Sequence, residues 1–188
     1  MALGLPFRVV ASRYAEDEDP GGDPAGAALA HARGKASEVA ARSGVPAGGC
    51  VIGADTVVAV DGLALGKPGD PAAADAMLRR LSGRVHQVVS AVALHDVAGE
   101  VAVADVTDVR FRPLSAEARA WYLGTGDWRE RAGGYAIQGA GAALVEAIDG
   151  DYTTVVGLPV AALLALLTER GLAPWQGGAG PPRDPAGP

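Results

Sequence analysis

The sequence predicts a fold of mixed α and β structure, of the α/β or the α+β class, with both parallel and antiparallel strand pairing. Two observations support this prediction. Of the 188 residues, 49% are hydrophobic, which is enough to bury a core, and most of these are alanine or valine. Segments with helical periodicity also alternate with β-patterned runs along the chain, so we expect helices and strands to pack together in one domain.

The first quarter of the chain is expected to contain a strand and a long helix. Residues 3–10 indicate a turn that leads into a strand, and an acidic stretch follows at 16–19. Residues 25–43 are rich in alanine and place apolar side chains three and four apart, which is typical of a helix. Gly44 and Pro46 end this helix.

The middle of the chain predicts a buried strand, a helix and a hairpin. Residues 50–60 form an apolar run that contains the polar sequence Gly-Ala-Asp-Thr, and Asp61-Gly62 is a turn signal. Residues 71–81 predict a helix that begins at a proline. Residues 85–95 and 101–112 predict an antiparallel hairpin.

The last part of the folded chain is expected to combine helices with two short strands. The predicted order is a helix at 115–123, a glycine-rich segment at 124–141, strands at 143–148 and 152–156, and a helix at 159–170. We place the domain at residues 1–173. Residues 174–188 are mainly glycine and proline and predict a disordered tail.

Charge and composition exclude several classes of function. The net charge of −6 disfavours nucleic acids and anionic membranes as partners, although a local cationic pocket could still bind a small phosphorylated ligand. No segment approaches the roughly 18 uninterrupted apolar residues of a membrane helix, and no signal peptide opens the chain. The lone Cys50 excludes an internal disulfide. We therefore expect a cytoplasmic protein.

Several well-known motifs are absent. The sequence at 62–68 is one residue short of a phosphate-binding loop, and 139–144 departs from the dinucleotide fingerprint at its last position. His31, His86 and His95 show no metal-ligand spacing, so we expect structural or surface roles for them.

Two acidic residues and the only two lysines are the candidates for chemistry. Asp55 lies inside the apolar run, where an unpaired carboxylate would cost about 2–7 kcal/mol or more. It either caps a turn or marks a site. A hairpin at 61–62 would return Lys67 toward Asp55. Glu16 and Lys35 are candidates of the same kind, with a solvated loop and an exposed helix lysine as the alternatives.

Two carboxylates and two lysines suit metal-assisted chemistry on a phosphate. Carboxylate oxygens hold Mg²⁺, and lysines offset the charge that develops on phosphates in the transition state. A carboxylate near the metal can take a proton from an attacking water. Because the sequence offers no plausible catalytic triad, we expect direct attack by water.

The segment AGGYAIQG at 132–139 suggests a base-binding turn. Tyr135 offers a face for stacking, and the Gln138 amide can both donate to and accept from an imide edge such as that of uracil or thymine. The alternative is a tight glycine turn in which Gln138 bonds to the backbone. The segment at 150–159 leads into a helix N-terminus, which can receive an anion.

In this order, the segments resemble the Maf family of nucleoside triphosphate pyrophosphatases, from about Leu3 to Leu172. The matching pieces are LGLPF at 3–7, Glu16, ARGKA around Lys35, VIGADTVV at 51–58, LGKP at 65–68, residues 72–94, AGGYAIQG at 132–139 and GDYTTVVGLP at 150–159. The resemblance implies an elongated α/β fold, like that of inosine triphosphatases, with two lobes around a deep cleft. It also implies a homodimer that hydrolyses a nucleoside triphosphate to the monophosphate and pyrophosphate with Mg²⁺ or Mn²⁺.

The resemblance assigns roles to individual residues. Asp55 is expected to be the proton acceptor and Glu16 its acidic partner at the metal, with Glu18 as the alternative to Glu16. Lys35 and Lys67 are expected to bind the phosphates. Thr56 and Gln138 are the expected specificity residues, and the Ile-Gln-Gly form at 137–139 resembles the branch that prefers dTTP and UTP over 7-methyl-GTP.

One family segment has no counterpart here, since no Ser-Pro-Arg sequence occurs in the 188 residues. That observation motivates a second hypothesis, a catalytically weak nucleotide-binding or regulatory protein linked to cell division. A third hypothesis is a fragment whose sheet keeps an unpaired edge.

Overall fold

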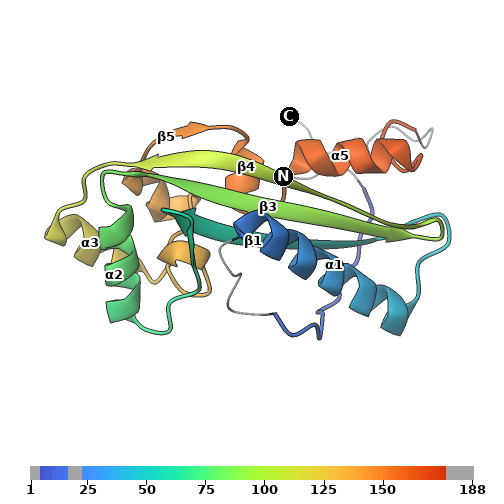
Figure 1. Ribbon diagram of the computed structural model, residues 1–188, viewed down its shortest axis with the longest axis horizontal. Coiled ribbons are helices and arrows are strands. Elements are labelled where there is room, and N and C mark those ends of the chain that lie inside the picture. Colours follow the sequence, from blue (N-terminus) through green and yellow to red (C-terminus); the bar gives the residue numbers. More distant parts are fainter. Residues whose placement is uncertain (1–4, 17–22, 177–188) are drawn as a thin grey trace, which may run out of the picture.

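A five-stranded antiparallel sheet in the order β2-β1-β3-β4-β5 forms the centre of the fold (Figure 1). We describe it from a computed structural model, which covers residues 5–16 and 23–176. The strands are β1 (Val51–Val60), β2 (Leu63–Leu65), β3 (Val85–Asp96), β4 (Gly99–Phe111) and β5 (Val145–Asp149). Three long strands, β1, β3 and β4, run along the molecule and give it an elongated shape.

One face of the sheet is covered by α1 (Pro24–Ser43). The helix begins where the Asp23 side chain accepts a hydrogen bond from the Gly26 amide at 3.0 Å. Three alanines on its buried side lie against alanines of β3; they are Ala28, Ala32 and Ala36. Small side chains on both elements allow the helix axis to come close to the strands.

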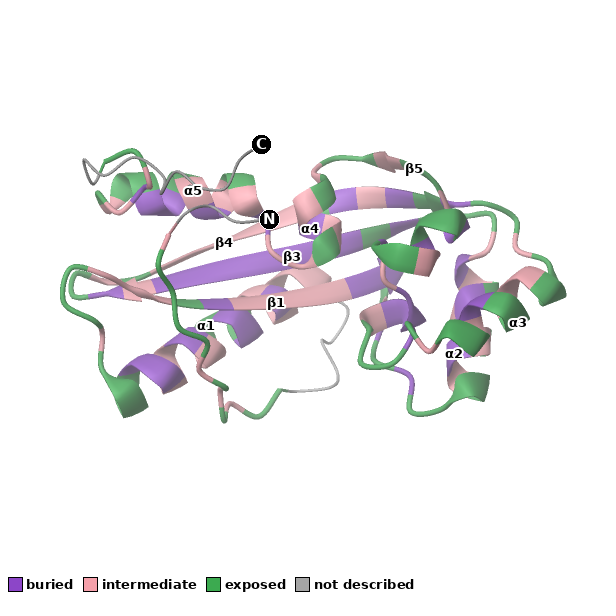
Figure 2. Ribbon diagram, turned by 180° about the vertical axis from the view of Figure 1, so that it is seen from behind, coloured by how far each residue is buried: buried purple, intermediate pink, exposed green. Residues whose placement is uncertain are grey.

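The opposite face carries two groups of helices, one at each end of the sheet (Figure 1). At one end, α5 (Val160–Glu169) packs leucines against Val92 and Leu94 of β3. At the other end, α2 (Pro71–Leu81) and α3 (Ala116–Thr125) share a core with the sheet. Figure 2 shows the buried stretches along β3 that these helices cover.

Three short helical segments lie between the larger elements, two between α3 and β5 and one between β5 and α5. They are the 3-10 helices η1 (Ala132–Gly134) and η2 (Gly139–Leu144) and the single-turn helix α4 (Tyr152–Val156). Both η1 and α4 contribute to the pocket described below, so they matter more for the site than for the core.

The structure confirms the mixed α and β class and corrects three details. Each of the four described strand pairs is antiparallel, so the expected parallel pairing is wrong. Two of these pairs are hairpins, which can only be antiparallel. The strand predicted at 152–156 is the helix α4, because the Asp151 side chain accepts from the Thr153 amide at 2.7 Å and starts a helical turn. Residues 5–10 lie outside the sheet.

The carboxyl-terminal part of the described chain continues past α5 into a turn. There the Gln176 side chain accepts a hydrogen bond from the Ala173 amide at 3.0 Å. The predicted tail from residue 174 otherwise lies at 177–188, outside the described residues. Across residues 5–16 and 23–176, the helices are all too short or too polar to cross a membrane.

Candidate active site

Asp55 lies on the face of β1 that α1 covers, and a glycine brings the helix close to it. A Cβ placed on Gly53 would lie 2.3 Å from the Ala32 carbonyl oxygen, so no larger residue fits without moving the helix. This close approach positions two side chains of α1 over Asp55. Lys35 Nζ lies 2.6 Å from Asp55 Oδ1, and His31 Nδ1 lies 3.4 Å from Oδ2.

Glu16 reaches the same place from the segment before α1. The Glu38 carboxylate of α1 accepts hydrogen bonds from the Ser12 hydroxyl and the Arg13 amide, at 3.2 and 3.0 Å. Tyr14 packs its ring over Gly34, where a Cβ would collide with it. These contacts hold the segment along the helix. They place Glu16 Oε1 at 2.7 Å from Lys35 Nζ.

Lys35 therefore joins the two carboxylates of the site. Burial disfavours its charge, but the hydrogen bonds to Asp55 and Glu16 outweigh burial and raise the pKa of Lys35. The hydrogen bond from Lys35 likewise lowers the pKa of Glu16. Both shifts favour the ion pair between the Lys35 ammonium group and the Glu16 carboxylate.

Lys67 enters from the opposite side, after the predicted hairpin. The turn at 61–62 returns the chain through β2, and the Gly66 carbonyl then accepts a hydrogen bond from the Gly133 amide at 3.1 Å. Gly133 has a φ of 68° and lies so close to Val58 that a side chain would not fit. Lys67 Nζ lies 4.0 Å from Glu16 Oε2 and its side chain is 54% exposed, free to meet a ligand.

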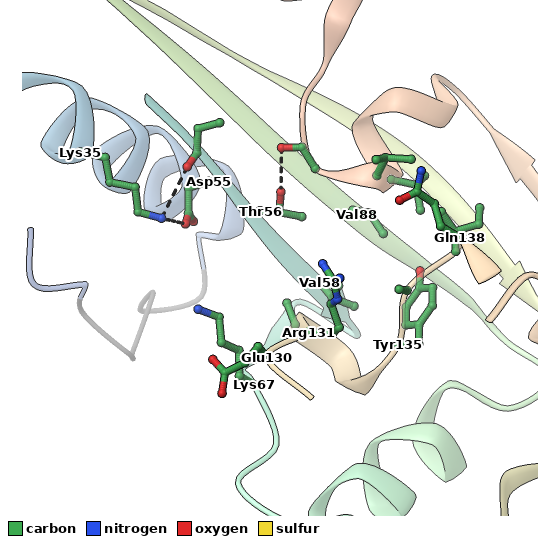
Figure 3. A pocket seen from close by; sticks show the side chains of 17 residues that line it. Lys35, Asp55, Thr56, Val58, Lys67, Val88, Glu130, Arg131, Tyr135 and Gln138 are labelled. Carbon is green, nitrogen blue, oxygen red and sulfur yellow. Dashed lines mark hydrogen bonds and ion pairs between the residues drawn. The ribbon is translucent and has the colours of Figure 1, made fainter. Parts of the chain in front are cut away.

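Lys35, Asp55 and Lys67 line one end of a pocket whose other end differs in chemistry (Figure 3). Lys35, Asp55 and Lys67 lie on one side of the view, and Gln138 lies on the other with Tyr135. Gln138 is exposed, and among the described residues no hydrogen bond to the protein holds its amide. The pocket thus combines a charged end with an end that offers an unengaged amide.

Tyr135 supports the pocket rather than offering a free face. It is 5% exposed, its hydroxyl lies 2.8 Å from His86 Nε2, and its ring meets Phe111 edge-on. Burial raises the pKa of Tyr135 far above its usual range. The prediction that Tyr135 provides a stacking face is therefore wrong, because core contacts occupy its ring.

Thr56 belongs to the pocket but points to the opposite face of the sheet from Asp55. Neighbouring residues of a strand alternate between faces. Thr56 Oγ1 lies 2.8 Å from Ser90 Oγ, and the Ser90 hydroxyl donates to the Thr154 carbonyl at 2.6 Å. This chain of hydrogen bonds ties β1 and β3 to α4, so Thr56 sits in a different layer from the carboxylates.

Residues from both faces of the sheet line the pocket, because this part of β1 is an open edge. The short strand β2 pairs only with 58–60, so within the described residues 51–57 have a strand partner on the β3 side alone. The edge leaves the Ala54 carbonyl free to accept from Lys35 Nζ at 3.5 Å. A ligand at this edge can contact Asp55 and Thr56 together.

The residues at the charged end fit a divalent cation. Glu16, His31 and Asp55 each offer a ligand atom, and these atoms lie within 4.8 Å of one another. Lys35 engages one oxygen of each carboxylate, so the second oxygen of each faces other groups. Carboxylate oxygens and imidazole nitrogens are ligands for divalent ions. Glu18, the alternative to Glu16, lies outside the described residues.

Sequence reasoning missed one residue of the site, His31. His31 was expected to be structural or superficial, yet it is 8% exposed and faces Asp55. Its spacing of four from Lys35, which places both on one helix face, was the available signal. Arg131 also lines the pocket, next to the glycine turn.

Comparison with known proteins agrees with this geometry. The family model described as Maf-like protein matches residues 1–170. A protein of Symbiobacterium thermophilum named dTTP/UTP pyrophosphatase is 45% identical over 95% of this chain and 90% of its own length. Proteins with the same name from Thermus thermophilus and Deinococcus radiodurans are 45% and 44% identical, over 92% and 91% of this chain and 88% and 86% of their own lengths. The chain therefore belongs to the Maf-like protein family.

Proposed function

We propose that this protein hydrolyses a nucleoside triphosphate, dTTP, UTP or a modified pyrimidine analogue, to the monophosphate and pyrophosphate. The observation that carries the proposal is a row of ion pairs in which Lys35 joins Asp55 to Glu16, and Glu16 lies near Lys67. Asp55 and the two lysines line one end of a pocket that has Gln138 at the other. The names of the relatives, dTTP/UTP pyrophosphatase, support the same substrates.

Substrate binding follows from the two ends of the pocket. The triphosphate lies at the charged end, where Lys35 and Lys67 offset its negative charge. The base lies at the other end, where the Gln138 amide donates to a carbonyl oxygen of the pyrimidine and accepts from its N3–H. Thr56 lies between them and, together with Gln138, sets the choice of nucleoside.

Asp55 acts as the proton acceptor in the reaction. A water molecule attacks the α-phosphorus, the bond from that phosphorus to the α–β bridging oxygen breaks, and pyrophosphate leaves. The Asp55 carboxylate takes the proton of the water and returns it to solvent. Asp55 and Glu16 would hold Mg²⁺ or Mn²⁺, which neutralises phosphate charge when it is bound. Lys35 holds both carboxylates in place through its two ion pairs.

We also propose that residues 1–173 form one domain, which acts as a homodimer on free nucleotides in the cytoplasm. The family resemblance supports the dimer. The net charge of −6 disfavours a nucleic acid polymer as the ligand and favours a small anion held in a local cationic pocket.

The test is release of pyrophosphate from dTTP, UTP, CTP and GTP with Mg²⁺ or Mn²⁺. We expect turnover of dTTP and UTP, and a loss of roughly 100-fold or more in Asp55→Asn. Asp149→Asn is the matched control, because Asp149 is exposed on β5 and does not line the pocket. Equal rates in wild type and Asp55→Asn, with both folded by circular dichroism, would refute the proposal.

A further inference from the structure

His31 is a buried polar side chain aimed at the catalytic carboxylate. It lies one helical turn before Lys35 on α1, is 8% exposed, and places Nδ1 3.4 Å from Asp55 Oδ2. A buried imidazole has a polar requirement that apolar packing cannot meet. The group that it faces is Asp55, so its position relates it to the chemistry of the site rather than to the core.

The surroundings of His31 hold its ring in this position. The Tyr14 ring lies with its centre 6.0 Å from that of His31, tilted by 57°. The close approach of α1 to Gly53 fixes the helix backbone above the strand. The imidazole is therefore presented to Asp55 by a packed element and not by a loop.

Lys35 contacts only one oxygen of each carboxylate. Lys35 contacts Asp55 Oδ1 and Glu16 Oε1, at 2.6 and 2.7 Å. Asp55 Oδ2 faces His31 instead, and Glu16 Oε2 faces Lys67 at 4.0 Å. A cation bound by one oxygen of each carboxylate therefore leaves the two hydrogen bonds of Lys35 intact.

The spacing of the three groups suits ligation of a single ion. Their ligand atoms lie within 4.8 Å of one another. Two ligands at about 2.1 Å from one ion lie at most about 4.2 Å apart, so side-chain shifts of less than about 1 Å bring all three into range. Aspartate, glutamate and histidine in such proximity differ from the all-oxygen environment that Mg²⁺ prefers.

We propose that His31 supplies a nitrogen ligand to the divalent cation held by Asp55 and Glu16, and that the site consequently favours Mn²⁺ or a later transition ion over Mg²⁺. The inference rests on the metal site of the proposed function and deepens it. Imidazole binds manganese and the later ions more readily than magnesium, which keeps oxygen ligands and waters.

The decisive measurement is electron spin echo spectroscopy of Mn²⁺ bound to the whole chain, alone and with inorganic pyrophosphate, which contains no nitrogen. We expect a ¹⁴N modulation from a directly bound imidazole. In protein grown with ¹⁵N-histidine it should change to the ¹⁵N pattern, which identifies histidine without any substitution. In His31→Gln it should disappear, and Mn²⁺ affinity relative to Mg²⁺ should fall about tenfold or more.

His95→Gln is the matched control, since this histidine lies on β3, where it pairs with Val51 of β1, and is outside the cluster. It should keep the modulation. Bound Mn²⁺ without histidine modulation, modulation that persists in His31→Gln, or no Mn²⁺ binding by the folded wild type would each overturn the proposal. Pyrophosphate release with Mg²⁺ is measured on the same samples. Release without histidine modulation overturns this inference alone, whereas modulation without release overturns the proposed function alone.

Discussion

Gly53 of β1 and Ala32 of α1 approach so closely that a Cβ on the glycine would lie 2.3 Å from the alanine carbonyl oxygen. This contact sets the height of the helix above the strand. Because Lys35 and His31 both project from α1 toward Asp55, the distance between the two backbones determines whether the charged end of the pocket forms at all.

Gly53→Ala is expected to lower both stability and activity. The added methyl forces the helix outward, which costs about 1–3 kcal/mol of unfolding free energy. A displacement of about 1 Å at the Asp55 site lowers kcat/KM for dTTP by roughly 100-fold. Urea unfolding and pyrophosphate release check both effects. Gly124→Ala is the control, because a Cβ there meets nothing within 4 Å, and it should leave activity unchanged.

Lys67→Met is expected to weaken substrate binding without unfolding the protein. The lysine side chain is 54% exposed and 4.0 Å from its nearest carboxylate partner, so it contributes little to the fold. Loss of its charge should lower kcat/KM roughly 10- to 100-fold. Steady-state kinetics with dTTP should show the lower kcat/KM, and the melting temperature should stay unchanged. Full activity would show that Lys67 does not meet the phosphates.

Gln138→Ala is expected to change the choice of base. Its amide is exposed at the end of the pocket remote from Asp55, so its loss removes hydrogen bonds to the pyrimidine without disturbing the carboxylates. The kcat/KM for dTTP and UTP should fall roughly 2- to 10-fold relative to that for CTP. Gln87, an exposed glutamine on β3, provides the control: Gln87→Ala should leave the ratio of kcat/KM for dTTP to that for CTP unchanged.

His86 should make the fold sensitive to mild acid. Burial lowers the pKa of His86 to about 4, against 6.5 for the unfolded chain. Between these values the unfolded state binds the proton more readily, so stability is complete above pH 6.5 and declines as the pH falls toward 4. The decline amounts to about 3 kcal/mol. Urea unfolding between pH 4 and 6.5 gives the unfolding free energy at each pH. This free energy should change less with pH in His86→Gln than in the wild type, and His95→Gln should match the wild type.

Much of the site could be predicted because local signals and topology agree. A carboxylate inside a buried strand marks Asp55, and the Asp61-Gly62 turn explains how Lys67 returns to it. The positions of Glu16 and Lys35 came from the resemblance, and the contacts between them agree with the roles proposed.

The features that prediction missed depend on contacts between distant segments. Val155 and Val156 favour a strand, but the Asp151 cap turns their segment into a helix. His31 shows no ligand spacing along the chain, because its neighbour Asp55 comes from another element. The burial of the Tyr135 ring was missed for a similar reason, because its neighbours His86 and Phe111 come close only in the folded protein.

The alternation of Asp55 and Thr56 at the open edge of β1 has a consequence for variation in this protein. The side chains that contact Asp55 belong to α1. Those in the hydrogen-bond network of Thr56 belong to β3 and α4, and the two sets share no hydrogen bond among the described residues. Substitutions behind one residue should therefore combine additively with substitutions behind the other. Substitutions at Ser90 or Thr154 should then alter base preference while the contacts of Asp55 with α1, on which hydrolysis depends, stay unchanged.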